Sequence, residues 1–172
     1  MSAIAVFGSS LPREGEPAYE EARELGREIA RRGAAIVCGG YGGVMEAACR
    51  GAAELGGEAI GVVLARAGEP NRWVTRRVVA EDLAARLRHL RDDADGWVFL
   101  PRGLGTMLEL VFVAESVVKG ETQGRPVVLL GPFWKGTLAA ILSESAGPGA
   151  ATLERALRFA ADPGEAARLA LT

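Results

Sequence analysis

Three short apolar runs in this chain each end in a glycine-rich turn, and this arrangement restricts the fold more than any other feature. The three turns are Gly8-Ser9-Ser10, Gly39–Gly43 and Gly103–Thr106. Short apolar runs of this kind are typical of strands buried in a parallel sheet. Because ligands of open α/β sheets bind beyond the carboxyl ends of the strands, we expect all three turns at one ligand-binding edge.

Segments with helical spacing separate the apolar runs. Apolar residues recur every three or four positions in 17–32, where Pro17 suits the first turn and Gly33 suits the end. Strands alternating with helices predict parallel pairing. The sequence therefore predicts an α/β fold, a Rossmann-like three-layer sandwich with a central parallel sheet and helices on both faces, as a single domain over residues 1–172. The remaining strands are expected at 59–63, 76–79 and 126–130, and the remaining helices at 44–55, 82–91, 106–119, 135–143, 152–160 and 164–171.

The composition favours a soluble cytoplasmic protein. The net charge is −2 and the apolar fraction is 49%, so nothing draws the chain to nucleic acid or to a membrane. The N-terminus lacks the features of a signal peptide. The two cysteines form no CxxC pair, and two separated cysteines with one histidine disfavour a metal site. We expect no metal, no cofactor, no nucleic-acid partner and no membrane partner.

Glycine turns before helices suit the binding of a phosphate group. Glycine lets the backbone approach a ligand closely, and the free N–H groups and dipole of the following helix favour an anion. The structural alternative is that these glycines serve only tight turns. Three turns that converge on one edge make this alternative the weaker one. No Gly-Lys-Ser/Thr follows any of the turns, and the first is not a GxGxxG fingerprint. The sequence therefore predicts a phosphate-bearing nucleotide, but neither a P-loop enzyme nor an NAD enzyme.

Three motifs resemble those of the LOG ("Lonely Guy") family of cytokinin-activating proteins, often labelled lysine-decarboxylase-like. Val6–Ser10 resembles the opening strand and turn of the family, and Gly39–Met45 resembles its GGGxxGLM turn. Pro101–Glu109 resembles its signature PGGxGTxxE, with Arg86 fifteen residues before Pro101. The sequence departs from the pattern at Arg102, which replaces the second Gly of PGG, and at Leu108, where the family has Glu. It departs also at Cys38, which replaces the first Gly of GGG, and in the neutral residues around Arg86.

The resemblance implies a metal-independent phosphoribohydrolase, which cleaves the N-glycosidic bond of AMP or an N6-modified AMP to give free base and ribose 5-phosphate. It implies that Glu109 and Arg86 are catalytic. Glycoside cleavage passes through an oxocarbenium-like state that a carboxylate stabilises. Outside this pattern, Glu109 would be an ordinary acid of a first helical turn and Arg86 an ordinary surface residue. The expected nucleotide-binding residues are Gly8, Ser9, Ser10, Gly39, Gly40, Gly42, Gly43, Met45, Arg102, Gly103, Leu104, Gly105 and Thr106.

A related branch with a similar second turn includes molybdenum-cofactor carrier proteins, so a non-catalytic nucleotide- or molybdopterin-cofactor-binding protein is the alternative function. Lysine decarboxylase activity is disfavoured, because Lys119 and Lys135 lie far from the glycine turns in sequence. The segment 106–119 is apolar on nearly all sides. This pattern, together with the dimers of the family, predicts a homodimer or a higher homo-oligomer. A central helix of the sandwich is the alternative explanation.

Overall fold

Seven strands pair into one sheet in the computed structural model, which describes residues 1–122, 124–143 and 148–172. Their order is β4-β3-β2-β1-β5-β6-β7, and every pairing is parallel. The expected parallel α/β fold is therefore confirmed. The strands are β1 (Ala3–Phe7), β2 (Ala35–Cys38), β3 (Ala59–Leu64), β4 (Arg76–Ala80), β5 (Gly96–Phe99), β6 (Val127–Leu130) and β7 (Leu157–Ala160).

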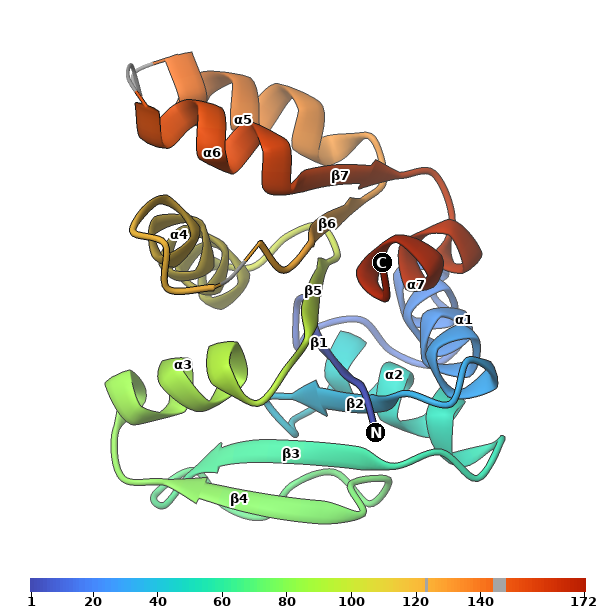
Figure 1. Ribbon diagram of the computed structural model, residues 1–172. Helices are drawn as coiled ribbons and strands as arrows, with labels where there is room; N and C mark the ends of the chain where they lie inside the picture. Colours follow the sequence, from blue (N-terminus) through green and yellow to red (C-terminus); the bar gives the residue numbers. More distant parts are fainter. Residues whose placement is uncertain (123, 144–147) are drawn as a thin grey trace.

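Helices cover both faces of the sheet, so the expected three layers are present (Figure 1). One face carries α1 (Pro17–Arg31), α2 (Val44–Ala53) and α7 (Pro163–Ala170). The other face carries α3 (Leu83–Asp92), α4 (Leu104–Val118), α5 (Phe133–Ser143) and α6 (Pro148–Ala156).

The sheet is buried on both faces because its side chains alternate between two apolar clusters. In β1, Ile4 and Val6 pack toward α1 and α2, whereas Ala5 and Phe7 pack toward α3 and α4. The ring of Phe7 stacks on that of Phe99, with 4.6 Å between the ring centroids. This burial fixes the ends of β1 and β5, from which the first and third glycine turns leave.

One predicted helix is wrong at both ends. It was expected to begin at 152, but α6 begins at Pro148. The segment 152–160 was expected to be helical throughout, but α6 ends at Ala156 and residues Leu157–Ala160 form β7. These four residues pair in parallel with β6. Pairing between strands overrides the local preference of a short segment and cannot be recognised in the sequence of that segment alone. The bounds of the other expected elements agree with the structure within two residues.

The chain changes direction in the middle of the sheet, beside β1. From β1 it moves outward through β2, β3 and β4, and α3 then leads back to β5 on the other side of β1 (Figure 1). The loops that follow β1 and β5 therefore lead to helices on opposite faces. Crevices for ligands form at such a point in open α/β sheets.

Candidate functional site

The three glycine turns meet around Ser9. The backbone N–H of Val44 donates to the carbonyl oxygen of Ser9 at 2.9 Å. A side chain at Gly43, whose φ is 65°, would place its Cβ 2.4 Å from the same oxygen. At Gly103, a Cβ would lie 3.5 Å from Cα of Ser9. The sequence needs glycine at Gly43 because the first and second turns touch there.

A cavity of about 410 Å³ opens beside this junction. Its walls come from the turns after β1 and β5, from the second turn and the start of α2, and from the facing sides of α3 and α4. The lining residues are Gly8, Ser9, Ser10, Leu11, Tyr41, Met45, Arg86, Gly103, Leu104, Gly105, Thr106 and Glu109.

Arg86 and Glu109 form a buried pair in the wall of this cavity. Each residue is 8% exposed. Nη1 of Arg86 lies 3.4 Å from Oε1 of Glu109, and Nε of Arg86 donates to the carbonyl oxygen of Val62 at 3.0 Å. The contact with Val62 anchors the guanidinium on β3. The contact with Glu109 is longer than the 2.7–2.9 Å that is typical of charge-assisted hydrogen bonds.

Burial raises the pKa of Glu109 to about 7. Loss of water around the carboxylate is the largest cause, and the positive charge of Arg86 opposes it only in part. A carboxyl group with a pKa near neutrality can both accept and donate a proton at physiological pH. Strongly shifted groups in a cavity are typical of functional sites.

Two residues of the second turn shape the surroundings of Arg86. A Cβ at Gly39 would lie 2.0 Å from Nη2 of Arg86, so only glycine leaves room for the guanidinium. The guanidinium carbon lies 5.5 Å from the ring centroid of Tyr41, a cation–π distance. Tyr41 is itself held by its hydroxyl oxygen, which accepts from the backbone N–H of Leu64 at 3.0 Å.

The N-terminus of α4 faces the same cavity. Gly103 precedes the helix with φ 103°, and the helix continues for 15 residues. The first N–H groups of a helix have no partner within it, and they carry the positive end of the helix dipole. Thr106 adds a buried hydroxyl in this first turn. An arrangement of this kind can bind an anion such as a phosphate group.

The cavity brings together ten of the residues expected from the sequence. Gly39 and Gly40 lie buried behind it, whereas Gly42 and Gly43 line a neighbouring cavity of about 240 Å³. Arg102 is exposed and lines neither cavity. Sequence reasoning missed Leu11 and Tyr41 as lining residues. The sequence feature that could have identified Tyr41 is its place as the aromatic residue within the five-residue glycine turn.

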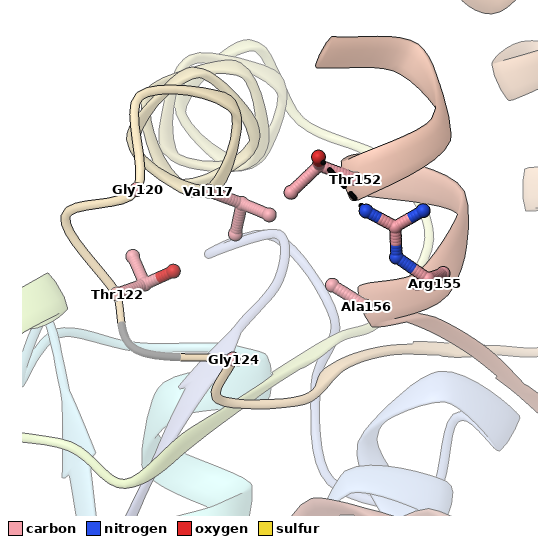
Figure 2. Close-up of a pocket in the computed structure, with 7 residues that line it drawn as sticks. All are labelled: Val117, Gly120, Thr122, Gly124, Thr152, Arg155 and Ala156. Atoms are coloured by element: carbon pink, nitrogen blue, oxygen red, sulfur yellow. Dashed lines mark hydrogen bonds between the residues drawn. The ribbon is translucent and has the colours of Figure 1, made fainter. Parts of the chain in front are cut away.

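A separate cavity of about 280 Å³ lies between the C-terminal end of α4 and α6 (Figure 2). In it, Nη2 of Arg155 donates to Oγ1 of Thr152 at 3.2 Å. Among the residues that the structure describes, no carboxylate lines the walls of this cavity. It therefore lacks the acid–base pair that the first cavity holds.

The residues that the structure describes hold no group of three or more His, Cys, Asp and Glu side chains that is able to bind a metal ion. Within the same residues, the helices are too short or too polar to cross a membrane. The single histidine, His89, is partly exposed and lies outside the cavity, with its Nδ1 3.0 Å from Oδ2 of Asp93.

Several known proteins are similar to this chain in sequence and in fold. A cytokinin riboside 5′-monophosphate phosphoribohydrolase of Mycobacterium tuberculosis is 29% identical over an alignment of 140 residues. The alignment covers 76% of this chain and 71% of that protein. The molybdenum cofactor carrier protein of Chlamydomonas reinhardtii is 29% identical, with a TM-score of 0.75 over 97% of this chain and 94% of that one.

The molybdenum cofactor binding protein of Rippkaea orientalis is 25% identical, with a TM-score of 0.76 over 98% of this chain and 94% of that one. The expected resemblance to LOG-like, Rossmann-like proteins is thus confirmed. The sequence profile of the SLOG cluster4 family matches residues 1–153. The chain belongs to the SLOG cluster4 family.

Proposed function

We propose that the protein is a nucleoside 5′-monophosphate phosphoribohydrolase, which converts AMP or an N6-modified AMP to free base and ribose 5-phosphate. The observation that carries this proposal is the buried pair of Arg86 and Glu109 in a cavity that also holds the N-terminus of α4. The pair supplies an acid–base group, and the helix supplies an anion site. Similarity to the mycobacterial phosphoribohydrolase supports the same assignment.

The arrangement suits a ligand with its phosphate at the first turn of α4 and its ribose toward Glu109. Glu109 is one helical turn after Thr106, on the buried side of the helix. A phosphate held at Gly103–Thr106 therefore places the sugar of a mononucleotide within reach of the carboxylate. The carboxylate then stabilises the positive charge that develops on the sugar ring as the glycosidic bond breaks.

The reaction consumes one water. The bond between C1′ and the base nitrogen breaks, and its electron pair stays on the base. The oxygen of water bonds to C1′, and ionised Glu109 accepts the proton that this water loses. The base takes up a proton, so the products are free base and ribose 5-phosphate. Arg86 holds the carboxylate in place and lowers its pKa relative to burial alone.

The test is incubation of the purified protein with AMP and with N6-modified AMPs, with free base and ribose 5-phosphate measured by chromatography. Glu109→Gln keeps the size of the side chain but cannot accept the proton, and we expect it to lower turnover by about 10²- to 10⁴-fold. Glu115→Gln, an exposed change on the same helix, is the matched control and should keep full turnover. Unchanged turnover in Glu109→Gln contradicts the proposal.

A non-catalytic nucleotide- or molybdopterin-cofactor-binding protein is the second candidate. Two observations favour it: similarity to the two molybdenum cofactor proteins over nearly the whole chain, and the neighbouring cavity of about 240 Å³. The two cavities share Ser10 and Leu11 in their walls, so together they offer room for a ligand longer than a mononucleotide. Tight binding of a ligand without release of free base supports this function over hydrolysis.

A further inference from the structure

The two cysteines of this chain lie side by side under the second glycine turn. Sγ of Cys38 and Sγ of Cys49 are 3.4 Å apart, both residues are fully buried, and both thiols are free. The sequence contains two cysteines in total. An intramolecular reaction between them therefore has no competing thiol within the same chain.

Cys38 and Cys49 lie at the two ends of a segment that helps to build the candidate site. Cys38 is the last residue of β2, and Cys49 lies on α2. Between them, Tyr41 and Met45 line the cavity. Nδ2 of Asn71 donates to the carbonyl oxygens of Gly40 and Tyr41, at 3.1 and 2.9 Å. A bond between the two sulfurs would close this segment into a loop.

The surroundings of Cys38 favour its thiolate. The backbone N–H of Gly40 donates to Sγ of Cys38 at 3.3 Å. The contact with Cys49 lowers the pKa of Cys38, burial opposes this lowering, and the N–H of Gly40 and the positive charge of Arg86 add to it. The same contact and burial raise the pKa of Cys49. Cys38 is therefore the nucleophile of the pair, since the thiolate is the reactive form of cysteine.

We propose that Cys38 and Cys49 form a reversible disulfide that switches the candidate site between two states. The oxidant is a small hydroperoxide. The Cys38 thiolate attacks one oxygen of hydrogen peroxide and becomes a sulfenic acid. The other oxygen leaves as hydroxide, which takes up a proton to give one water. The Cys49 thiol then attacks the Cys38 sulfur and releases a second water. Two thiols and one hydrogen peroxide thus give one disulfide and two waters.

The disulfide changes the site through Gly39. Two sulfurs at 3.4 Å must approach to about 2.05 Å, which pulls the end of β2 toward α2. Gly39 follows Cys38 directly, and its Cα lies so close to Arg86 that a Cβ there would be 2.0 Å from Nη2. Arg86 in turn contacts Glu109. Oxidation should therefore displace the guanidinium and lower the affinity of the cavity for a nucleotide.

The test treats the folded protein with hydrogen peroxide, alkylates it under denaturing conditions, and measures the intact mass. We expect both alkylation sites to disappear, a loss of two hydrogens in the unalkylated mass, and full reversal by dithiothreitol. Non-reducing electrophoresis should show a single chain. AMP affinity should fall at least tenfold in the oxidised form and return on reduction. Thiols that both stay alkylatable, or a disulfide only between chains, overturn the proposal.

Two variants and one ligand-independent measurement complete the test. Cys49→Ala and Cys49→Ser cannot form the disulfide, and the serine variant retains a polar group if the alanine variant fails to fold. Neither should show the reversible loss of AMP affinity. Hydrogen exchange of the segment 39–49 should differ between the oxidised and reduced protein. Because mass and exchange do not depend on AMP, reduced protein that fails to bind AMP counts against the proposed function alone. A disulfide that leaves both exchange and affinity unchanged overturns the switch.

Discussion

Nη1 of Arg86 lies 3.4 Å from Oε1 of Glu109, yet the pKa of Glu109 is raised to about 7. An arginine at a short, bidentate distance would lower the pKa of a carboxyl group. Here the contact is single and long, so the loss of hydration outweighs the attraction. Because the pair is buried in a cavity wall, small changes in either residue should change the protonation of Glu109 at neutral pH.

Removal of the charge of Arg86 should raise the pKa of Glu109 further. In Arg86→Met, burial acts without an opposing cation, whereas Arg86→Lys retains a positive charge near the carboxylate. We expect the pKa of Glu109 to lie above 7 in the methionine variant and closer to the wild-type value in the lysine variant. The carboxyl chemical shift of Glu109, followed by NMR as a function of pH, measures this. An unchanged midpoint in Arg86→Met would show that the cation has no influence on Glu109.

Glu109 should also make the stability of the protein depend on pH. Its pKa rises from the ordinary 4.5 to about 7 on folding, so the folded state binds the proton more tightly than the unfolded state. The resulting stabilisation is fully present below pH 4.5 and is lost as the pH rises through 7. A shift of this size corresponds to about 3 kcal/mol.

Urea unfolding of the wild type and of Glu109→Gln at several pH values between 4 and 8 measures this loss. Glutamine does not titrate, so its free energy of unfolding relative to the wild type should rise with pH by up to about 3 kcal/mol. Contributions of the other titrating groups cancel in the difference. A difference that is constant over this range would contradict a raised pKa of Glu109.

The sequence predicted the residues that line the cavity better than it predicted their protonation. Glu109 and Thr106 follow from the spacing of the third turn, and both line the cavity. The protonation of Glu109 could not be predicted, because it depends on contacts across the fold. Arg86 reaches Glu109 because its Nε donates to the carbonyl oxygen of Val62 on β3 and because Gly39 leaves space beside Nη2.

The errors have the same origin. The sequence predicts that a helix extends over Leu157–Ala160, whereas pairing with β6 makes this short segment a strand. Tyr41 was missed because its role depends on Leu64, whose N–H positions the ring beside Arg86. Such partners are distant in the sequence and adjacent only in the folded chain.

Arg102 should carry backbone strain that glycine would relieve. It is the residue other than glycine with positive φ, 78°, among the residues that the structure describes. The left-handed conformation costs a residue with a side chain about 1–2 kcal/mol, and part of the gain from glycine is lost to the entropy of the unfolded chain. We expect Arg102→Gly to raise the free energy of unfolding by about 1 kcal/mol.

Arg102→Ala is the control for this prediction, because it removes the charge but keeps the Cβ and its strain. Thermal unfolding should therefore show an increase in Tm for the glycine variant only. If Arg102 binds the phosphate of the ligand, both variants should bind AMP more weakly than the wild type in a titration. Equal stability of the two variants would mean that the turn carries no strain at Arg102.

Self-association should occur through the outer side of α4. Leu104, Leu108 and Val111 are 88%, 42% and 51% exposed, and their spacing places them on one side of the helix. Exposed apolar rows of this kind are typical of surfaces that bind another protein. We expect a homodimer, twice the chain mass of 18.0 kDa, by light scattering.

The double variant Leu108→Glu/Val111→Glu should shift this dimer to the monomer, because two carboxylates at a buried interface lose hydration without gaining a partner. Leu55→Glu is the matched control, since Leu55 is 47% exposed just after α2, on the other face of the sheet. Both variants should keep the circular dichroism spectrum of the wild type. A wild-type mass equal to one chain would contradict the dimer, and a dimer that persists in the double variant would place the interface elsewhere.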